Sequence, residues 1–352
     1  MHALVLTLAL LTADQIVDRH IEARGGAEKF RTVRTLVYRG GTYREGDYVG
    51  SGNAFMAFAR PYYRVVGNPE DPKVEIMEGY DGSAWEYYAN PGIVVRTVGA
   101  ASSASRRGTY IDWRLGDFRT HGNKIERGPE ETIAGRPAYR IIVTTRDGFV
   151  TQHFFDQETF LTLASRYNAP FHAFGDVVKT ESRPGDWRAV DGVMFAFQDA
   201  EVDLATGKVL NSMTWGTIEI NRELPPSWFA PRVFARTRLG SLLEHLYAQR
   251  TDPAAVMWSY ADFREVHPDV DTHEGIEVIG YQMLKMGDSR AAVALLEANA
   301  RDYPDAPTAA FGLGRAYETA GEKEKARAEY QRALRLKPDY KRAADALQRI
   351  TP

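Results

Sequence analysis

The stretch Val190-Asp191-Gly192-Val193-Met194-Phe195-Ala196-Phe197 decides how this chain folds, because it places an Asp-Gly turn before alternating apolar residues. A second strand-like run follows at residues 209–220, so the region predicts a β-hairpin with one apolar face. A lone hairpin is only marginally stable in water, and these strands therefore need partners in a larger sheet. Beyond residue 231 the alternation disappears and the sequence reads as helical.

Similar strand-like runs fill most of the chain before this hairpin. They are separated mainly by Glu-Gly-Asp, Asp-Gly or similar turns and cover residues 33–44, 48–59, 62–66, 74–80, 84–88, 124–131, 138–146, 149–155, 161–167 and 176–182. With the hairpin as the last two strands, this predicts about eleven strands in one large antiparallel sheet. A sheet of that many twisted strands tends to curl, which predicts a barrel-like form.

Short helical segments interrupt the strands. Ile16, Val17 and His20 recur at helical spacing before Gly25-Gly26, and a second short helix is expected at residues 27–31. Residues 99–107 are small and polar and could form a helix or a loop. Residues 111–118 have the pattern of an amphipathic helical turn. Helices of this kind could pack against the inside of a curled sheet.

The second part of the chain contains an internal repeat. Gly280 and Gly314 are separated by the 34 residues typical of tetratricopeptide repeats, and so are Pro304 and Pro338. Small residues in such a repeat let paired helices approach, and proline ends the second helix. A weaker copy is expected before it, with helices near 239–249 and 254–266, and a last helix at 340–350 would cap the stack.

Composition excludes several classes of function. The 352 residues carry 44 Lys+Arg and 47 Asp+Glu, a formal net charge of −3, without the basic excess of a nucleic-acid binder. Cysteine is absent, which excludes disulfides, thiolate metal sites and cysteine nucleophiles.

The N-terminus has the pattern of an export signal. Residues 3–11 form a short apolar run that cannot span a bilayer but matches the hydrophobic part of a secretory signal. We therefore predict a signal peptide at residues 1–13 and a periplasmic or secreted protein. The alternative is a buried first strand or helix, which would leave the protein in the cytoplasm.

No sequence motif indicates a catalytic centre. His-Glu-x-x-His, Gly-x-Ser-x-Gly and phosphate-loop patterns are absent, so we expect a protein that is not an enzyme and has no cofactor and no metal. The densest group of ligating residues is His267-Pro268-Asp269-Val270-Asp271-Thr272-His273-Glu274. It could hold a divalent ion if a loop gathered these side chains. It could equally be an exposed connection in which Asp or Thr caps the next helix.

Apolar side chains on the strands allow two interpretations. They could fill a thick core beneath the helices, or they could line a cavity for an apolar guest such as a lipid. A lipid carrier needs few polar contacts, which agrees with the absence of catalytic motifs. The predicted lipid-binding residues are Phe58, Trp85, Tyr87, Tyr139, Ile141, Val143, Phe154, Phe195 and Phe197.

Residues 14–231 resemble the outer-membrane lipoprotein carrier and sorting proteins (LolA/LolB-like). The resemblance rests on the order of short motifs: Ile16-Val17-Asp18-Arg19-His20, Tyr80-Asp81-Gly82, Gly135-Arg136-Pro137-Ala138-Tyr139, Phe155-Asp156 and Val190 to Phe197. It implies an unclosed antiparallel barrel with plugging helices, a hydrophobic cavity and a periplasmic location. Ala196 stands where such sequences commonly have proline, and carriers proper do not usually carry a repeat domain.

The sequence thus predicts an α+β half-barrel at 14–231, a linker at 232–238 and an all-α repeat domain at 239–352. The half-barrel is expected to bind a lipid or a lipoprotein acyl chain, and the repeats to recruit a protein or peptide, without nucleic acid and without a membrane span. The tetratricopeptide resemblance implies that Tyr281, Arg315 and Glu318 face the partner groove. The alternative function is an interaction scaffold in the cell envelope with no lipid ligand.

Overall fold

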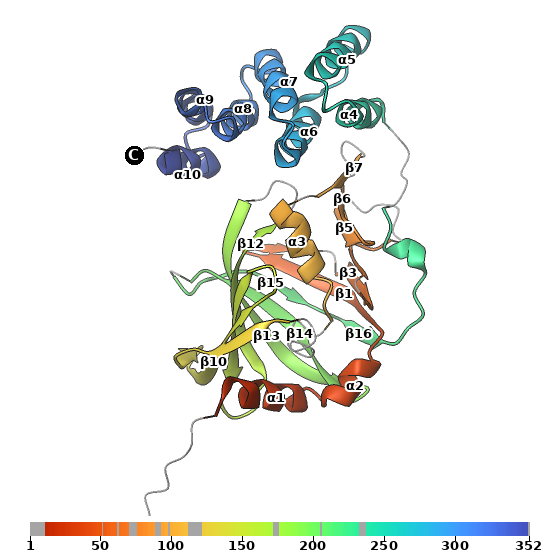
Figure 1. The fold of residues 1–352 in the computed structure, drawn as a ribbon, viewed down its shortest axis with the longest axis vertical. Helices are drawn as coiled ribbons and strands as arrows, with labels where there is room; N and C mark the ends of the chain where they lie inside the picture. Colours follow the sequence, from red (N-terminus) through yellow and green to blue (C-terminus); the bar gives the residue numbers. More distant parts are fainter. Residues whose placement is uncertain are drawn as a thin grey trace, which may run out of the picture.

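The computed structural model describes residues 11–50, 52–61, 63–69, 76–88, 93–97, 99–111, 122–171, 176–204, 206–231 and 237–350. These residues form a curled β-sheet with short helices, followed by a layer of seven helices (Figure 1). The predicted fold class, an unclosed antiparallel sheet joined to a helical repeat region, is confirmed. The predicted helical turn at 111–118 falls almost entirely outside the described residues.

One antiparallel sheet makes up the β region, with sixteen strands in the described residues rather than about eleven. The number is higher because two of the predicted runs each form two strands: the run at 48–59, and the run at 209–220, which breaks at Trp215-Gly216. Two further short strands lie where the sequence shows no clear strand pattern. The strands are β1 (Thr35–Glu45), β2 (Tyr48–Val49), β3 (Ala54–Ala59), β4 (Tyr63–Val66), β5 (Ile76–Tyr80), β6 (Ala84–Tyr88), β7 (Ile93–Arg96), β8 (Lys124–Arg127), β9 (Glu131–Ile133), β10 (Arg136–Thr144), β11 (Val150–Asp156), β12 (Thr162–Phe171), β13 (Asp176–Val190), β14 (Val193–Val202), β15 (Val209–Thr214) and β16 (Thr217–Ile220).

Strand β1 joins the two halves of the sheet. The order is β7-β6-β5-β4-β3-β1-β15-β14-β13-β12-β11-β10-β8, so each half is a run of neighbouring hairpins. The start of β1 pairs with β16, and its later residues, 42–44, pair with β15. Strands β7 and β8 end the order, and no pairing joins them within the described residues, so the sheet stays unclosed.

The Asp191-Gly192 turn joins β13 to β14. Both residues have positive φ, 49° for Asp191 and 78° for Gly192, as a two-residue type I′ hairpin turn requires. Residues 209–214, the expected hairpin partner of β14, form β15 and pair with β14 along the edge that does not face β13. The last long strands of the chain therefore lie in the middle of the sheet, where they connect its two halves.

The two faces of the sheet pack against different segments. Helices α1 (Ala13–Ala23), α2 (Ala27–Thr32) and α3 (Gly99–Arg107) lie on what we call the inner face, which carries Tyr38 and Phe195 (Figure 1). What we call the outer face carries Val37 and Trp85 and is covered by residues 224–229. Because side chains alternate along a strand, neighbouring residues such as Val37 and Tyr38 enter different cores.

Helix α1 begins at Ala13, the last residue of the predicted signal peptide, and its N-cap, Thr12, also lies within that segment. Thr12 and Gln15 form a capping box, in which the Thr12 hydroxyl accepts from the Gln15 N–H and the Gln15 side chain accepts from the Thr12 N–H. Residues 1–10 of the predicted signal lie outside the described residues. Within the described part of the chain, every helix is too short or too polar to cross a bilayer.

The helices of the second part pair as the repeat predicts. Proline follows two residues after the end of α5, α7 and α9, where it stops the second helix of each pair. Val95 of β7 joins the apolar cluster of the first helices, so the helical layer contacts the sheet through this strand. The helices are α4 (Arg238–Ala248), α5 (Pro253–Val266), α6 (His273–Met286), α7 (Ser289–Asp302), α8 (Pro307–Thr319), α9 (Lys323–Leu336) and α10 (Lys341–Ile350).

Candidate functional site

The candidate site is a cavity of about 420 Å³ on the inner face of the sheet. Its lining comes from α1, β1, β3, β4 and the strands β11 to β15, so it extends across the junction that β1 makes between the two halves. This volume lies within the range of pockets that hold small molecules. Strands from both halves of the sheet therefore build this site together.

One wall of the cavity is apolar and aromatic. The Tyr38 and Trp215 rings pack with their centroids 5.1 Å apart and their planes tilted by 54°, and Met56 and Phe195 continue this wall. Gly41 makes the arrangement possible, since a Cβ atom there would lie 2.7 Å from the Trp215 ring. The apolar wall thus depends on a glycine that interrupts the alternation of β1.

Beside this apolar wall, on the same face of the sheet, lies a polar wall, a row of polar side chains that crosses five neighbouring strands. The strand register aligns Asn211, Glu201, Ser182, Ser165 and His153 on the same face. The Asn211 amide donates to Glu201 at 2.6 Å, and the Ser165 hydroxyl lies 3.0 Å from Nδ1 of His153. The cavity is therefore amphipathic rather than purely hydrophobic.

Asp199 adds a second carboxylate to this wall. The Ser182 hydroxyl donates to its carboxylate, with 2.9 Å to each oxygen. Burial raises the pKa of Asp199 to about 6, with a smaller upward contribution from the charge of Glu201 and a downward one from the Ser182 hydrogen bond. At neutral pH the cavity consequently holds a carboxylate whose charge is poorly solvated.

His20 closes the cavity on the side of α1. Its Nδ1 lies 2.8 Å from the Phe160 carbonyl oxygen, and its ring packs against Phe155 at 4.3 Å between centroids. Burial, followed by the charge of Arg24, lowers the pKa of His20 to about 3. The ring is therefore neutral near pH 7, and it acts as an uncharged part of the lining.

The structure distributes the predicted lipid-binding residues over several cores. Phe195 lines the cavity, and Phe58 and Phe197 lie in the same inner-face cluster, packed around α2. Tyr139, Ile141 and Val143 also face inward, but α1 covers them.

The remaining predicted residues face outward. Trp85 and Tyr87 pack beneath residues 224–229, where the Trp85 indole donates to the Phe229 carbonyl at 2.8 Å. Phe154 lies in a separate outer cluster with Ile133 and Ala164. The sequence could not separate these groups, because the strands are apolar on both faces.

The polar row was not recognised from the sequence, although a signal for it exists. Ser165 and Ser182 alternate with Arg166, Glu181 and Arg183, so β12 and β13 are polar on both faces. On the outer face, buried Glu181 accepts from Arg166 at 2.5 Å and from Arg183 at 2.6 Å. Strands with this pattern inside an otherwise apolar sheet indicate a polar lining.

The predicted partner-binding residues lie on the first helices of two repeats and on their contacts. Tyr281 on α6 is only 3% exposed, and the Arg315 guanidinium from α8 lies 5.4 Å from its ring centroid. Glu318 accepts from the buried Tyr330 hydroxyl and from Arg349. These residues therefore belong partly to the packing between repeats.

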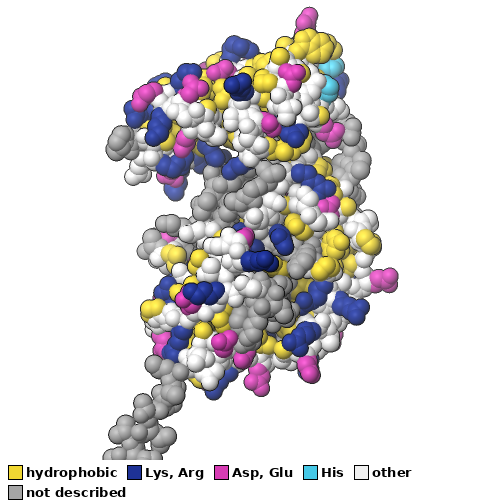
Figure 2. Space-filling model, viewed as in Figure 1, with side chains coloured by type: hydrophobic (Ala, Val, Ile, Leu, Met, Phe, Trp, Pro, Cys, Tyr) yellow, Lys and Arg dark blue, Asp and Glu magenta, His cyan; other side chains and the backbone are white. Residues whose placement is uncertain are grey.

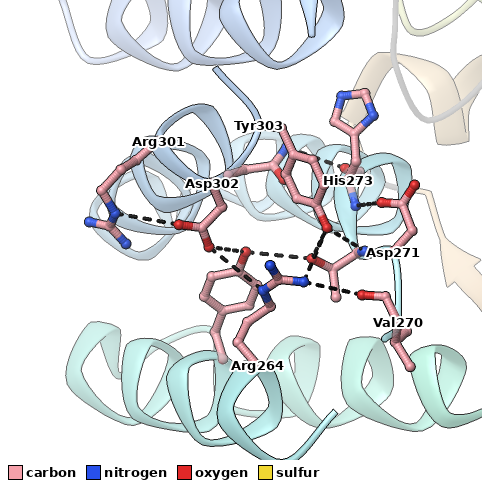
Figure 3. A network of polar contacts seen from close by, with 10 residues as sticks. Arg264, Val270, Asp271, His273, Arg301, Asp302 and Tyr303 are labelled. Atoms are coloured by element: carbon pink, nitrogen blue, oxygen red, sulfur yellow. Dashed lines mark hydrogen bonds and ion pairs between the residues drawn. The ribbon is translucent and has the colours of Figure 1, made fainter. Parts of the chain in front are cut away.

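The cluster at 267–274 forms a polar connection between helix pairs (Figure 3). The Tyr303 hydroxyl accepts from the Thr272 N–H at 2.9 Å, and the Tyr260 hydroxyl donates to Asp302 at 2.8 Å. Arg264 donates to the Val270 carbonyl oxygen at 3.1 Å. Among the described residues, no group of three or more acidic or histidine side chains is arranged to hold a metal ion.

The face of the molecule drawn in Figure 2 carries charged side chains of both signs. On the face in Figure 2, lysine and arginine side chains alternate with acidic ones over both the helices and the β region. This agrees with the small net charge of −3.

Comparison with known families identifies the repeats. Residues 283–341 match the tetratricopeptide repeat family, which confirms the predicted repeat over the end of α6, the helices α7 to α9 and the start of α10. A comparison with curated proteins gave no significant match.

Several solved structures are similar to this chain. A DUF1329 family protein from Desulfovibrio piger has 14% identity and a TM-score of 0.43, and covers 62% of this chain and 97% of its own. A LolA superfamily protein from Nitrosomonas europaea has 14% identity and a TM-score of 0.42, with coverages of 63% and 99%. A domain described as an outer membrane lipoprotein-sorting protein from Vibrio parahaemolyticus has 10% identity and a TM-score of 0.41, with coverages of 61% and 94%.

Proposed function

We propose that the β region binds a lipid or a lipoprotein acyl chain in its cavity, while the helical repeats hold a protein partner. The cavity of about 420 Å³ carries this proposal, because its lining includes the partly exposed apolar side chains of Met56 and Trp215 beside buried Tyr38 and Phe195. The protein acts without catalysis and works in the periplasm, after removal of residues 1–13.

Burial of an acyl chain is sufficient for useful affinity. Each buried methylene contributes about 0.8 kcal/mol, so a chain of about 16 carbons contributes on the order of 12 kcal/mol. Association costs at least about 4 kcal/mol, which leaves a favourable remainder. The ligand can therefore be held mainly by the wall that contains Tyr38, Met56, Phe195 and Trp215.

Native mass spectrometry of the protein purified from its own envelope tests this function. We expect bound lipid in the wild type and its loss in Met56→Trp, because the larger ring fills space beside Tyr38. Leu210→Trp is the matched control, since Leu210 is 43% exposed and lies next to Asn211 of the cavity lining. Equal lipid content in the wild type and Met56→Trp, or wild-type protein without lipid, would contradict the proposal.

The repeats support a second candidate function, an interaction scaffold with no lipid ligand. Its specific support is the tetratricopeptide match at residues 283–341. A pull-down from envelope extract should lose its partner when Arg315→Glu changes the surface of α8, whereas Arg301→Glu on α7 should retain it. If Phe195→Asp abolished capture while Arg315→Glu did not, the scaffold function would be rejected.

A further inference from the structure

Asp199 is a feature of the cavity that a plain acyl chain does not explain. Asp199 is half-buried in the cavity lining. Aspartate is seldom withdrawn from water unless it is paired, because removing a charge from water costs several kcal/mol. Its carboxylate accepts from the Ser182 hydroxyl, but no lysine, arginine or histidine among the described residues forms an ion pair with it. The accessible part of Asp199 faces the cavity. A counter-ion for this carboxylate could therefore come from the ligand.

A second carboxylate lies on the same side of the cavity. Glu201 is two residues further along β14, so its side chain points to the same face as Asp199. The two arginines of the cavity lining interact with other groups. Arg64 pairs with Glu78 at 2.8 Å, and Arg24 donates to the Met194 carbonyl oxygen and packs over the Phe30 ring at 4.6 Å. The polar wall is thus negative around Asp199.

Aromatic rings border these carboxylates. The register places Tyr43, Met213 and Asp199 in one row across β1, β15 and β14. Tyr38 is close enough that the charge of Asp199 acts on its hydroxyl. Carboxylates together with aromatic faces are suited to a cation, which gains both charge attraction and cation–π contact. An anionic head group in the same position would be repelled.

We propose that the cavity selects an amphiphile whose polar end is an ammonium group, with Asp199 and Glu201 as its counter-ions. The inference rests on the proposed lipid-binding function and specifies the ligand class. The apolar tail lies along Phe195 and Trp215, while the ammonium donates to the carboxylates. Other titratable or charged groups of the lining are Arg24, Arg64, His20, His153, Tyr38, Tyr43 and Tyr167.

Isothermal titration calorimetry of the full chain with dodecylamine, dodecanol and dodecanoate, each below its micellar concentration, tests the inference. The three probes share one tail and differ in the charge of the head. We expect dodecylamine to bind at least about tenfold more tightly than dodecanol, since hydrogen bonds to charged groups are the strong ones. Dodecanoate should bind most weakly.

Two substitutions identify the carboxylates responsible. Asp199→Asn and Glu201→Gln keep the shape of each side chain, and each should reduce the preference for the amine over the alcohol while alcohol binding stays unchanged. Glu158→Gln, at an exposed turn between β11 and β12, should leave the preference intact. Equal binding of amine and alcohol by the wild type, or a full preference in Asp199→Asn, overturns the inference but not lipid binding. Failure of all three probes to bind overturns the proposed function as well.

Discussion

Substitution of Gly314 by alanine is expected to lower the free energy of unfolding of the helical repeats by about 2 kcal/mol. A Cβ atom at this position would lie 2.6 Å from two atoms of the Tyr330 ring and 3.3 Å from the Ala326 carbonyl oxygen. Tyr330 is fully buried, so its ring cannot move aside, and helices α8 and α9 would have to separate. Thermal and urea unfolding followed by helical circular dichroism would measure the loss.

Gly312 on the same helix provides the matched control. A Cβ atom there would lie 3.5 Å from the Tyr281 hydroxyl, which is ordinary van der Waals contact. Gly312→Ala should therefore stabilise the repeats by about 0.5–1 kcal/mol, the usual gain in helix propensity. Similar changes in both variants would show that the close approach of α8 and α9 does not limit stability.

These two glycines illustrate why the helical half could be predicted from the sequence. A tetratricopeptide repeat is built from contacts between near neighbours in the chain, so its period, small residues and prolines all appear in the local sequence. Gly280 and Gly314 lie under Leu296 and Tyr330, the residues that the 34-residue alignment pairs with each other. In the repeats, the spacing of residues in the sequence therefore predicts which side chains pack together.

The β region could be predicted only in part. Turns such as Asp191-Gly192 and the alternation around them indicate strands, but they do not say which strands become neighbours. Strand β1 pairs with β15 and β16, some 170 to 185 residues later. Such distant pairing depends on the whole sheet, so the sequence predicted hairpins correctly but missed the junction that β1 makes.

The location of the cavity was hidden for a related reason. Phe154 and Phe155 are adjacent and both fully buried, yet one faces outward and the other packs under α1. A strand that is apolar on both faces gives no local sign of which face lines a cavity. Polar residues are a better sign of the cavity than apolar ones, because Ser182 and Glu201 lie on the inner face of a sheet that is otherwise well packed.

Acid is expected to destabilise the β region through His20. Its pKa falls from the ordinary 6.5 to about 3 in the folded protein, so below pH 6.5 the unfolded chain binds a proton that the folded chain does not. Stability therefore falls as the pH falls, by about 3 kcal/mol between pH 7 and pH 4.5 from this residue. Asp199 acts in the opposite direction, because its raised pKa of about 6 makes the folded state gain stability as the pH falls through that value.

Comparison of variants separates the two contributions. His20→Gln removes the titrating ring and leaves Asp199 in place, so its stability should change less between pH 7 and pH 4.5 than that of the wild type, or should rise. His245→Gln, at an exposed position on α4, should keep the wild-type pH dependence. Urea unfolding at several pH values measures both, and parallel curves for the wild type and His20→Gln would refute the assignment.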